Sequence, residues 1–340
     1  MGIYGLTQAS LQIPFGFLSD HLGRKKIIVF GLFIFMMGSI IAACSHSIMG
    51  VIIGRALQGA GAIGSATLAL IADFTSEQQR TKAMAIAGIS IGFSFVLAMI
   101  LGPVLSPFIH LKGIFWLAAG LGGIAIFLLL TAVPQSYTLS WHPDAEPELT
   151  QFFSLLKQGE LLRLNIGIFI LHAVLTASFV VLPISLETFT HINHAEQWKV
   201  FLPALIFAFV LVIPAIMLAE KKQAIKSFFL GAIALLGCSE YLFYLFAKNV
   251  LLSTLSLLLF FTAFSILEAF LPSLVSRTAP AARKGTALGI YSCSQFLGIF
   301  IGGLLSGWIY GKLGLTAVYV LCMIFIMVWF IVTPKAEMRA

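Results

Sequence analysis

The sequence predicts an all-α membrane protein built from two related helix bundles. Three observations support this fold class: the composition, the length and order of the apolar segments, and a repeat between the two halves of the chain. Of the 340 residues, 60% are hydrophobic and only 10% are charged, whereas a soluble domain carries about 25% charged residues. A chain of this composition cannot bury its apolar surface in one aqueous core, so the bilayer is its expected solvent.

Eleven apolar runs are long enough to form membrane helices, which need about 20 residues each. They cover residues 2–18, 27–44, 48–72, 83–109, 113–133, 164–186, 200–219, 227–247, 250–276, 285–310 and 315–332. The polar stretch between the fifth and sixth runs contains three prolines and four acidic residues. We therefore predict an N-terminal bundle over residues 1–133, a cytoplasmic linker over 134–163 and a C-terminal bundle over 164–340.

The basic residues predict the orientation, because lysine and arginine concentrate in cytoplasmic loops. One side of the predicted spans holds fifteen of the 20 basic residues, and the other side holds only four, at positions 112, 199, 248 and 312. This bias places the C-terminus in the cytoplasm and Met1 outside. Nothing near Met1 would carry the N-terminus across the membrane, so we expect one further helix before it and eleven of twelve transmembrane helices in this chain. The net charge of +7 forms no basic stripe, which argues against nucleic acid as a partner.

A repeat with a constant offset of 200 residues relates the two halves. It aligns Pro14 with Pro214, Asp20 with Glu220 and Ser39 with Ser239. The offset pairs the first span with the seventh, the second with the eighth and the fourth with the tenth. Transporters are often built from two such related bundles, so the repeat predicts pseudo-symmetry between the halves.

Three motifs follow one another in the first half of the chain. They are GFLSDHLGRKK at residues 16–26, RALQGAGA at 55–62 and GISIGFSFVLAMILGP at 88–103. In this order, they resemble three motifs of the major facilitator superfamily: the loop between helices two and three, the fourth-helix motif and the fifth-helix glycine-proline motif. The last two are typical of the drug/proton antiporter branch of that superfamily. The whole chain resembles the YajR-like inner-membrane transporters of that superfamily. The resemblance implies the major facilitator fold, eleven of its twelve helices, and a multi-pass location in a bacterial inner membrane.

The first motif has a physical interpretation of its own. Gly16 permits close approach of two helices, and Gly23 permits a tight turn. Asp20 places a negative charge where it can meet the positive N-terminal end of a helix. The alternative is that the basic residues of this loop only anchor the topology.

The resemblance implies a charge latch at the cytoplasmic face. It implies that Asp20 meets the helix that begins near Gly285 and Thr286, and that Arg24 bridges Asp20 to Asp73. Breaking this network during the transport cycle would let the two halves rock against each other. The same resemblance gives the Gly102–Pro103 pair the role of a hinge.

Charged residues inside membrane spans are costly and mark candidate functional sites. Arg55 is one, and the helical period places it on one face with Gln58, Ala62, Ser65 and Ala69; Gly59 belongs to the same motif. The alternative for Arg55 is that its side chain extends toward the outer interface.

Two further titratable residues lie in spans of the second half: His172, on a face with Asn165, and Glu268. The resemblance places both of their helices beside a central cavity. A histidine changes charge close to neutral pH, and burial favours the protonated form of a carboxyl group. Arg55, His172 and Glu268 are therefore the candidates for proton coupling, and a packing role is the alternative for each. Glu240 also lies within a span and receives no role.

The predicted function is secondary active transport: proton-coupled export of small amphipathic molecules or drugs by alternating access. The expected partners are a small-molecule substrate, protons and the lipid bilayer, with a monomeric chain and no cofactor beyond the coupling proton. One alternative is uptake or facilitated diffusion of a metabolite, and another is a transporter-like membrane sensor. We predict no enzyme activity, no catalytic residues and no metal site, because the sequence has no HExxH motif and no paired aspartates within its spans. It has no phosphate-binding GxxxxGK[ST] motif either.

Overall fold

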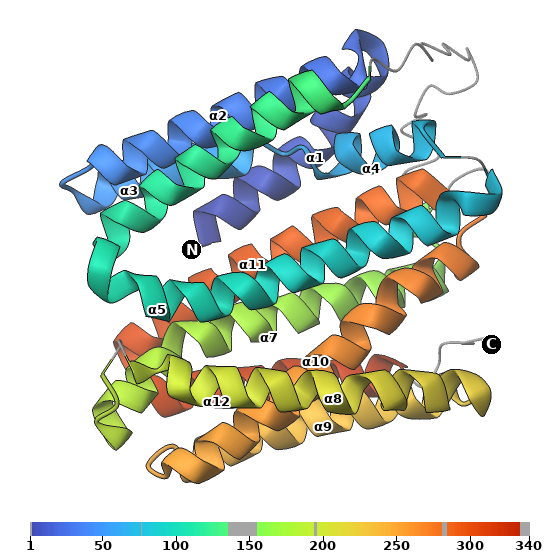
Figure 1. The fold of residues 1–340 in the computed structure, drawn as a ribbon. Helices are drawn as coiled ribbons and strands as arrows, with labels where there is room; N and C mark the ends of the chain where they lie inside the picture. The colour runs from blue at the N-terminus through green and yellow to red at the C-terminus, as the bar shows by residue number, and fades with distance from the viewer. Residues whose placement is uncertain (1, 76, 135–154, 194–195, 281–283, 334–340) are drawn as a thin grey trace. The chain divides into compact units, whose positions relative to one another are not determined.

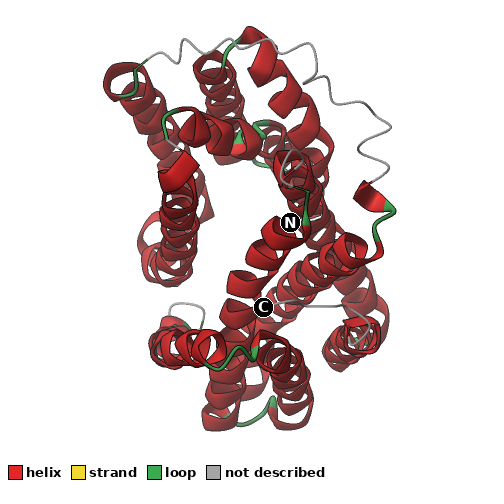
Figure 2. Ribbon diagram, turned by 90° about the vertical axis from the view of Figure 1, so that its right-hand side faces the viewer, coloured by secondary structure: helices red, strands yellow, loops and turns green. Residues whose placement is uncertain are grey.

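The computed structural model describes residues 2–75, 77–134, 155–193, 196–280 and 284–333. All regular elements in these ranges are helices, joined by short loops (Figure 2). The chain divides into two compact units, residues 3–147 and residues 148–340. The division lies within the predicted linker 134–163, of which residues 135–154 lie outside the described part of the chain.

Unit 1 contains five of the helices labelled in Figure 1. They are α1 (Gly2–Leu22), α2 (Arg24–Cys44), α3 (Ile48–Ala60), α4 (Gly64–Asp73) and α5 (Glu77–Ala132). The helices α2 and α3 pack closely because Gly38 and Gly54 face each other across the contact. A Cβ atom built on Gly38 would lie 2.6 Å from the Gly54 carbonyl oxygen, and a Cβ atom built on Gly54 would lie 2.7 Å from the Gly38 carbonyl oxygen. Small residues at such crossings let membrane helices approach. Three small apolar clusters lie in the interior of this unit, around residues 15, 27 and 62, around residues 28, 66, 70 and 129, and around residues 42, 43 and 115.

The predicted span 48–72 crosses as two helices rather than one. Helix α3 ends at Ala60, α4 begins at Gly64, and Gly61 leaves helical geometry with a ψ of 48°. A Cβ atom on Gly61 would collide with the Gly31 carbonyl group of α2, so the break lies where the two segments approach most closely. The predicted continuous face from Arg55 through Ser65 to Ala69 is therefore wrong, because the helical register is interrupted after Ala60.

The predicted spans 83–109 and 113–133 lie within α5. The backbone reverses at His110, which has a φ of 55° and a ψ of −179°, and the second part of α5 returns beside α2 (Figure 1). A non-glycine residue in this conformation is uncommon. The Gly102–Pro103 pair lies within the helix, and the departure from helical geometry in α5 is at His110 instead.

Unit 2 contains the remaining six helices. They are α7 (Gly159–Thr190), α8 (Trp198–Lys221), α9 (Ile225–Phe246), α10 (Val250–Thr278), α11 (Lys284–Leu313) and α12 (Leu315–Val332). Helix α7 begins at Gly159, inside the stretch predicted as linker, and it is the most extensively buried helix of the unit. It lies beside α11 (Figure 1), where Gly298 and Gly302 meet the carbonyl groups of Phe169 and Ala173. Helix α12 packs on its other side, with the Trp329 ring against Gly167.

Nine segments in the described ranges are long and apolar enough to cross a membrane. The predicted spans 2–18 and 83–109 are not separate members of this set. Helix α1 has 21 residues, but the amide side chains of Gln8 and Gln12 lower its hydropathy. Many side chains of the run 83–109 lie outside the described part of the structure. Large apolar side chains face outward on many helices, among them Phe127 at 65% and Leu251 at 78% exposure. A bilayer is the solvent that such surfaces require.

Candidate functional site

An ion pair joins the start of α2 to the end of α4 in unit 1. Arg24 Nε lies 3.2 Å from Asp73 Oδ2, and each side chain keeps a little over a fifth of its surface exposed. Arg24 is at the N-terminus of its helix and Asp73 is at the C-terminus of its helix, the unfavourable end for each charge with respect to the helix dipole. Local helix stability therefore does not explain these charges, whereas their pairing does.

The neighbours of Arg24 add to this network. Arg24 Nη1 donates a hydrogen bond to Ser19 Oγ at 2.9 Å, and Ser19 Oγ donates to the Gly16 carbonyl oxygen at 2.6 Å. Lys25 Nζ donates to the Val133 carbonyl oxygen at 2.6 Å and to that of residue 130 at 3.2 Å, so it satisfies carbonyl groups at the end of α5. Two basic residues of the loop thus make specific tertiary contacts, which goes beyond a role in topology alone.

The two glycines of the motif lie where a side chain would be unfavourable, Gly23 for its backbone conformation and Gly16 for lack of space. Gly23 has a φ of 97° in the turn between α1 and α2. A Cβ atom on Gly16 would lie 3.1 Å from Ser65 Oγ of α4, so α1 and α4 approach closely there. The side chain of Asp20 lies outside the described part of the structure. Gly285 and Thr286 fall in the first turn of α11, and the implied contact between that turn and Asp20 stays a prediction.

We expect Arg24→Gln and Asp73→Asn to show an energetic coupling of about 0.3–1 kcal/mol, because partly exposed ion pairs contribute in that range. A double-mutant cycle on the thermal unfolding of the purified chain in detergent measures it. The control cycle uses Lys199→Gln and Glu196→Gln, a pair joined at 2.6 Å with side chains about half exposed. The control coupling should vanish in high salt, and additivity of Arg24→Gln and Asp73→Asn at low salt would show that the tertiary pair stabilises nothing.

Arg55 is held inside unit 1 by polar and aromatic partners. Arg55 Nη1 donates to Gln58 Oε1 at 2.8 Å, and Gln58 Nε2 donates to Ser39 Oγ of α2 at 2.7 Å. The guanidinium carbon lies 4.6 Å from the ring centroid of Tyr4 on α1, within cation–π distance. Gly59 makes this possible, because a side chain there would collide with the Tyr4 carbonyl group. Arg55 therefore binds within its bundle instead of extending alone toward the interface.

His172 and Glu268, predicted separately from the sequence, lie together in unit 2. His172 Nδ1 on α7 is 3.9 Å from Glu268 Oε2 on α10. Gln295 on α11 joins them, with its Nε2 atom 2.8 Å from His172 Nε2 and 3.4 Å from Glu268 Oε1. His172 is buried, at 8% side-chain exposure, while Glu268 keeps 36%. Three helices thus converge on a histidine and a glutamate, of which the glutamate side chain is the more exposed.

The amide of Gln295 sets the hydrogen positions of this cluster. When Gln295 Nε2 donates to His172 Nε2, the neutral imidazole carries its hydrogen on Nδ1, the nitrogen that faces Glu268. The gap of 3.9 Å from Nδ1 to Glu268 Oε2 exceeds hydrogen-bond distance. Both atoms are buried without a hydrogen-bond partner among the described residues. A small relative movement of α7 and α10 would bring the two groups into contact.

Other polar groups nearby are also unsatisfied. Two such atoms are buried without a hydrogen-bond partner in the described ranges: the hydroxyl oxygen of Tyr291 and Oδ1 of Asn165. Tyr291 lies one helical turn before Gln295 on α11, and Asn165 lies two turns before His172 on α7. Buried polar atoms usually have partners. Their presence along α7 and α11 is typical of a site that water or a substrate completes.

Sequence reasoning did not find Gln295, Tyr4 or Ser19. A neutral polar residue inside a span carries a weak signal, because serine and glutamine also occur at helix contacts. The signal that existed for Gln295 was its place within KGTALGIYSCSQFLG, residues 284–298, a segment that resembles the YajR-like transporters. Glu240 had no assigned role, and the structure shows it fully buried with Ser178 Oγ donating to its Oε1 atom at 2.7 Å.

A polytopic helical protein with two bundles, and with ionisable groups held inside each of them, has the architecture of a secondary membrane transporter. Comparison with known families bears this out: the family model described as Major Facilitator Superfamily matches residues 1–291 and again 164–336. The chain belongs to the major facilitator superfamily.

Similar proteins agree with this assignment. The chain is 45% identical to the "Inner membrane transport protein YajR" of Escherichia coli over 337 residues, which is 99% of this chain and 74% of that protein. It is 30% identical to "Multidrug resistance protein 3" of Bacillus subtilis over 124 residues, 36% of this chain and 24% of that one. A solved structure, the human organic anion transporter MFSD10, matches with a TM-score of 0.73 at 19% identity, over 98% of this chain and 83% of that one, which shows a shared fold.

Proposed function

We propose that this membrane transporter exports small amphipathic molecules in exchange for protons across a bacterial inner membrane. The observation that carries the proposal is the cluster of His172, Glu268 and Gln295 inside unit 2. It joins two titratable groups that lie too far apart to satisfy each other. Such a cluster has the components to take up and release a proton: a carboxyl group on a partly exposed side chain, a neutral imidazole beside it and an amide that fixes the imidazole.

The polar group around Arg55 is the second support. A guanidinium group held by Gln58 and Tyr4 places a permanent positive charge within unit 1. In the superfamily, helices of both bundles line a shared cavity, and the motif around Arg55 is typical of the antiporter branch. A fixed cation in one bundle and a protonatable carboxyl group in the other would let protonation change the electrostatic potential that a substrate meets.

The proposed substrate class rests on two resemblances to other transporters. The motifs around Arg55 and Gly102 resemble those of drug/proton antiporters, and one similar protein is named for multidrug resistance. The protein of Escherichia coli is named only as an inner membrane transport protein. We therefore propose amphipathic molecules as a class and name no compound.

The ion pair of Arg24 and Asp73 has a place in this proposal. In the latch model, Arg24 joins Asp73 to Asp20, and Asp20 meets the first turn of α11 in the closed state. The described contacts of Arg24 provide the unit 1 half of such a latch. For the cytoplasmic side to open in this proposal, the contact of Asp20 with α11 would break while the ion pair of Arg24 with Asp73 is kept.

The test uses purified chain in liposomes with an acidic lumen and ethidium added outside. Molecules whose cytoplasmic face points outward should move dye inward while protons leave, and a protonophore should abolish the accumulation. Equal accumulation with and without the pH gradient would favour facilitated diffusion. Dye binding to the chain without any movement into the lumen would favour a membrane sensor, and either result would overturn proton-coupled export.

A further inference from the structure

A groove lies in unit 2, beside the half of α10 that follows Glu268. Three helices form it, α8, α9 and α10, and its volume is about 220 Å³. Its walls are mostly apolar, with Ile216 from α8, Ile225 from α9, and Phe270 and Leu274 from α10. Ala269 follows Glu268 in the chain, but in the described ranges no groove residue makes a hydrogen bond or an ion pair with His172, Glu268 or Gln295. The polar cluster does not include the groove.

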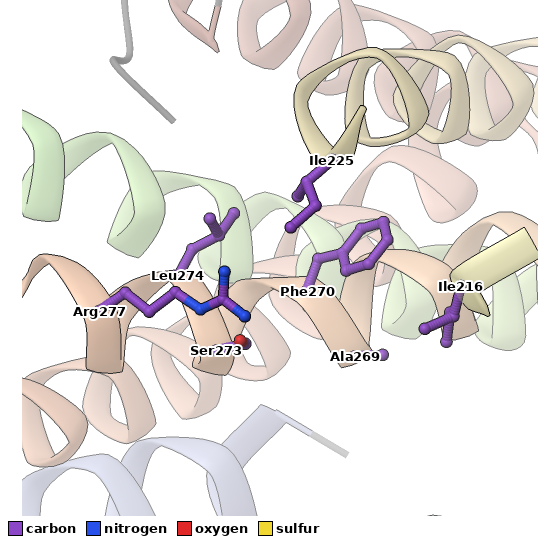
Figure 3. Close-up of a pocket in the computed structure, with 7 residues that line it drawn as sticks. All are labelled: Ile216, Ile225, Ala269, Phe270, Ser273, Leu274 and Arg277. Atoms are coloured by element: carbon purple, nitrogen blue, oxygen red, sulfur yellow. The ribbon is translucent and has the colours of Figure 1, made fainter. Parts of the chain in front are cut away.

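The polar part of the groove comes from one stripe of α10. Ala269, Ser273 and Arg277 follow one another at intervals of four residues, so they lie along the same face of the helix. Figure 3 shows the Arg277 side chain extended along this face, with its guanidinium group above Ser273 and next to Phe270. None of the acidic side chains in the described ranges pairs with Arg277. A cation thus lies over an apolar surface with its donors free for an anion.

More basic residues surround this end of the unit. Lys221 ends α8, Lys222 follows it, and Lys226 lies in the first turn of α9; Lys221 and Lys222 are exposed. One acidic residue, Glu220, lies beside them in the sequence, so four cations outnumber one anion. The distribution of basic residues predicts that this end faces the cytoplasm, at the depth where lipid headgroups lie.

The groove continues into surface that faces the bilayer. On α8, Ile213 is 60% exposed and Met217 is 66% exposed, and both lie within one turn of Ile216, which lines the groove. A ligand that fits this surface has an anionic group at one end and a long apolar chain at the other, and it lies along the membrane normal. A phospholipid of the inner leaflet has these properties, whereas a free anion would leave the apolar walls uncovered.

We propose that this groove is a binding site for an anionic phospholipid, with its phosphate at Arg277 and the neighbouring lysines and an acyl chain against Phe270 and Ile216. Basic pockets between membrane helices on the cytoplasmic side bind anionic headgroups in this way. Because the ligand would contact α8, α9 and α10 together, it would hold the ends of these helices in place. The proposal does not depend on what the protein transports.

Native mass spectrometry of the full chain in detergent tests the site, with phosphatidylglycerol and phosphatidylcholine of identical acyl chains as probes. Wild-type chain should retain phosphatidylglycerol at least about fivefold better, since a basic residue at a membrane surface contributes a preference of that size. Arg277→Gln should remove the preference, and Arg277→Lys should keep most of it. Ala269→Trp should lower the retention of phosphatidylglycerol with every charge intact, because the indole would fill the groove.

The matched control is Lys312→Gln. Lys312 lies in the last turn of α11, as Arg277 lies in the last turn of α10, but it does not line the groove. Its removal should leave the lipid preference unchanged. Equal retention of the two lipids by wild-type chain, or equal losses in Arg277→Gln and Lys312→Gln, would overturn the proposal, as would displacement of the lipid by inorganic phosphate alone. Size-exclusion profiles identify any misfolded variant. Because Arg277→Gln and Ala269→Trp change different parts of the groove, either one tests the proposal if the other does not fold.

Discussion

Replacing Glu268 by glutamine is expected to uncouple transport from the proton gradient. Glutamine keeps the size and the hydrogen bonding of the side chain near Gln295 but cannot bind a proton. The electrical part of the gradient supplies about 2.3 kcal/mol per charge per 100 mV, and without a site for the proton this free energy cannot reach the substrate. Gradient-driven accumulation of ethidium in liposomes should fall to about a tenth or less of wild type, as expected for loss of a functional intramembrane carboxyl group. Exchange of dye at equal pH should continue.

The matched control is Glu240→Gln, the same substitution in the same unit. Glu240 is buried and accepts a hydrogen bond from Ser178, but it lies outside the cluster of His172 and Gln295. Its replacement should leave the coupling unchanged. Full gradient-driven accumulation by Glu268→Gln would contradict the assignment of Glu268, and equal losses in both variants would show that any buried carboxyl group in this unit has the same effect.

The sequence was sufficient to predict the membrane fold and to single out several candidate site residues. Hydropathy and the distribution of basic residues identified the spans, since a bilayer imposes a length and a composition on each helix. Arg55, His172 and Glu268 stood out because a charge inside a span is costly. The ion pair between Arg24 and Asp73, implied by the resemblance, is present in the structure.

The partners of these residues were harder to predict. Nothing in the sequence specifies that Gln295 approaches both His172 and Glu268, because that contact depends on how α7, α10 and α11 pack. The break between α3 and α4 escaped prediction for a similar reason: the apolar run continues through Gly61, and only the close approach to Gly31 interrupts the helix. Hydropathy reports which segments enter the membrane and contains little information on helix register.

A second large effect is expected for Gly302→Ala on α11. A Cβ atom at this position would collide with the carbonyl group of Ala173 on α7. Backbone atoms cannot move aside as a flexible side chain can, so the two helices must separate. Overpacking of this kind costs about 1–3 kcal/mol, and the separation would also pull His172, the neighbour of Ala173, away from Gln295. We expect a lower midpoint of thermal unfolding for the purified chain, together with a loss of gradient-driven transport.

Gly307→Ala provides the comparison on the same helix. No atom lies within 4 Å of a Cβ atom built at Gly307, so the methyl group has space. Alanine also favours the helix over glycine by about 1 kcal/mol in water, and the midpoint should stay the same or rise. If both variants unfolded at the wild-type temperature, α7 and α11 would tolerate a wider spacing than the structure shows, and the polar cluster between them would not depend on close packing. A selective loss in Gly302→Ala would instead show that the absence of a side chain at Gly302 sets the distance at which His172 and Gln295 meet.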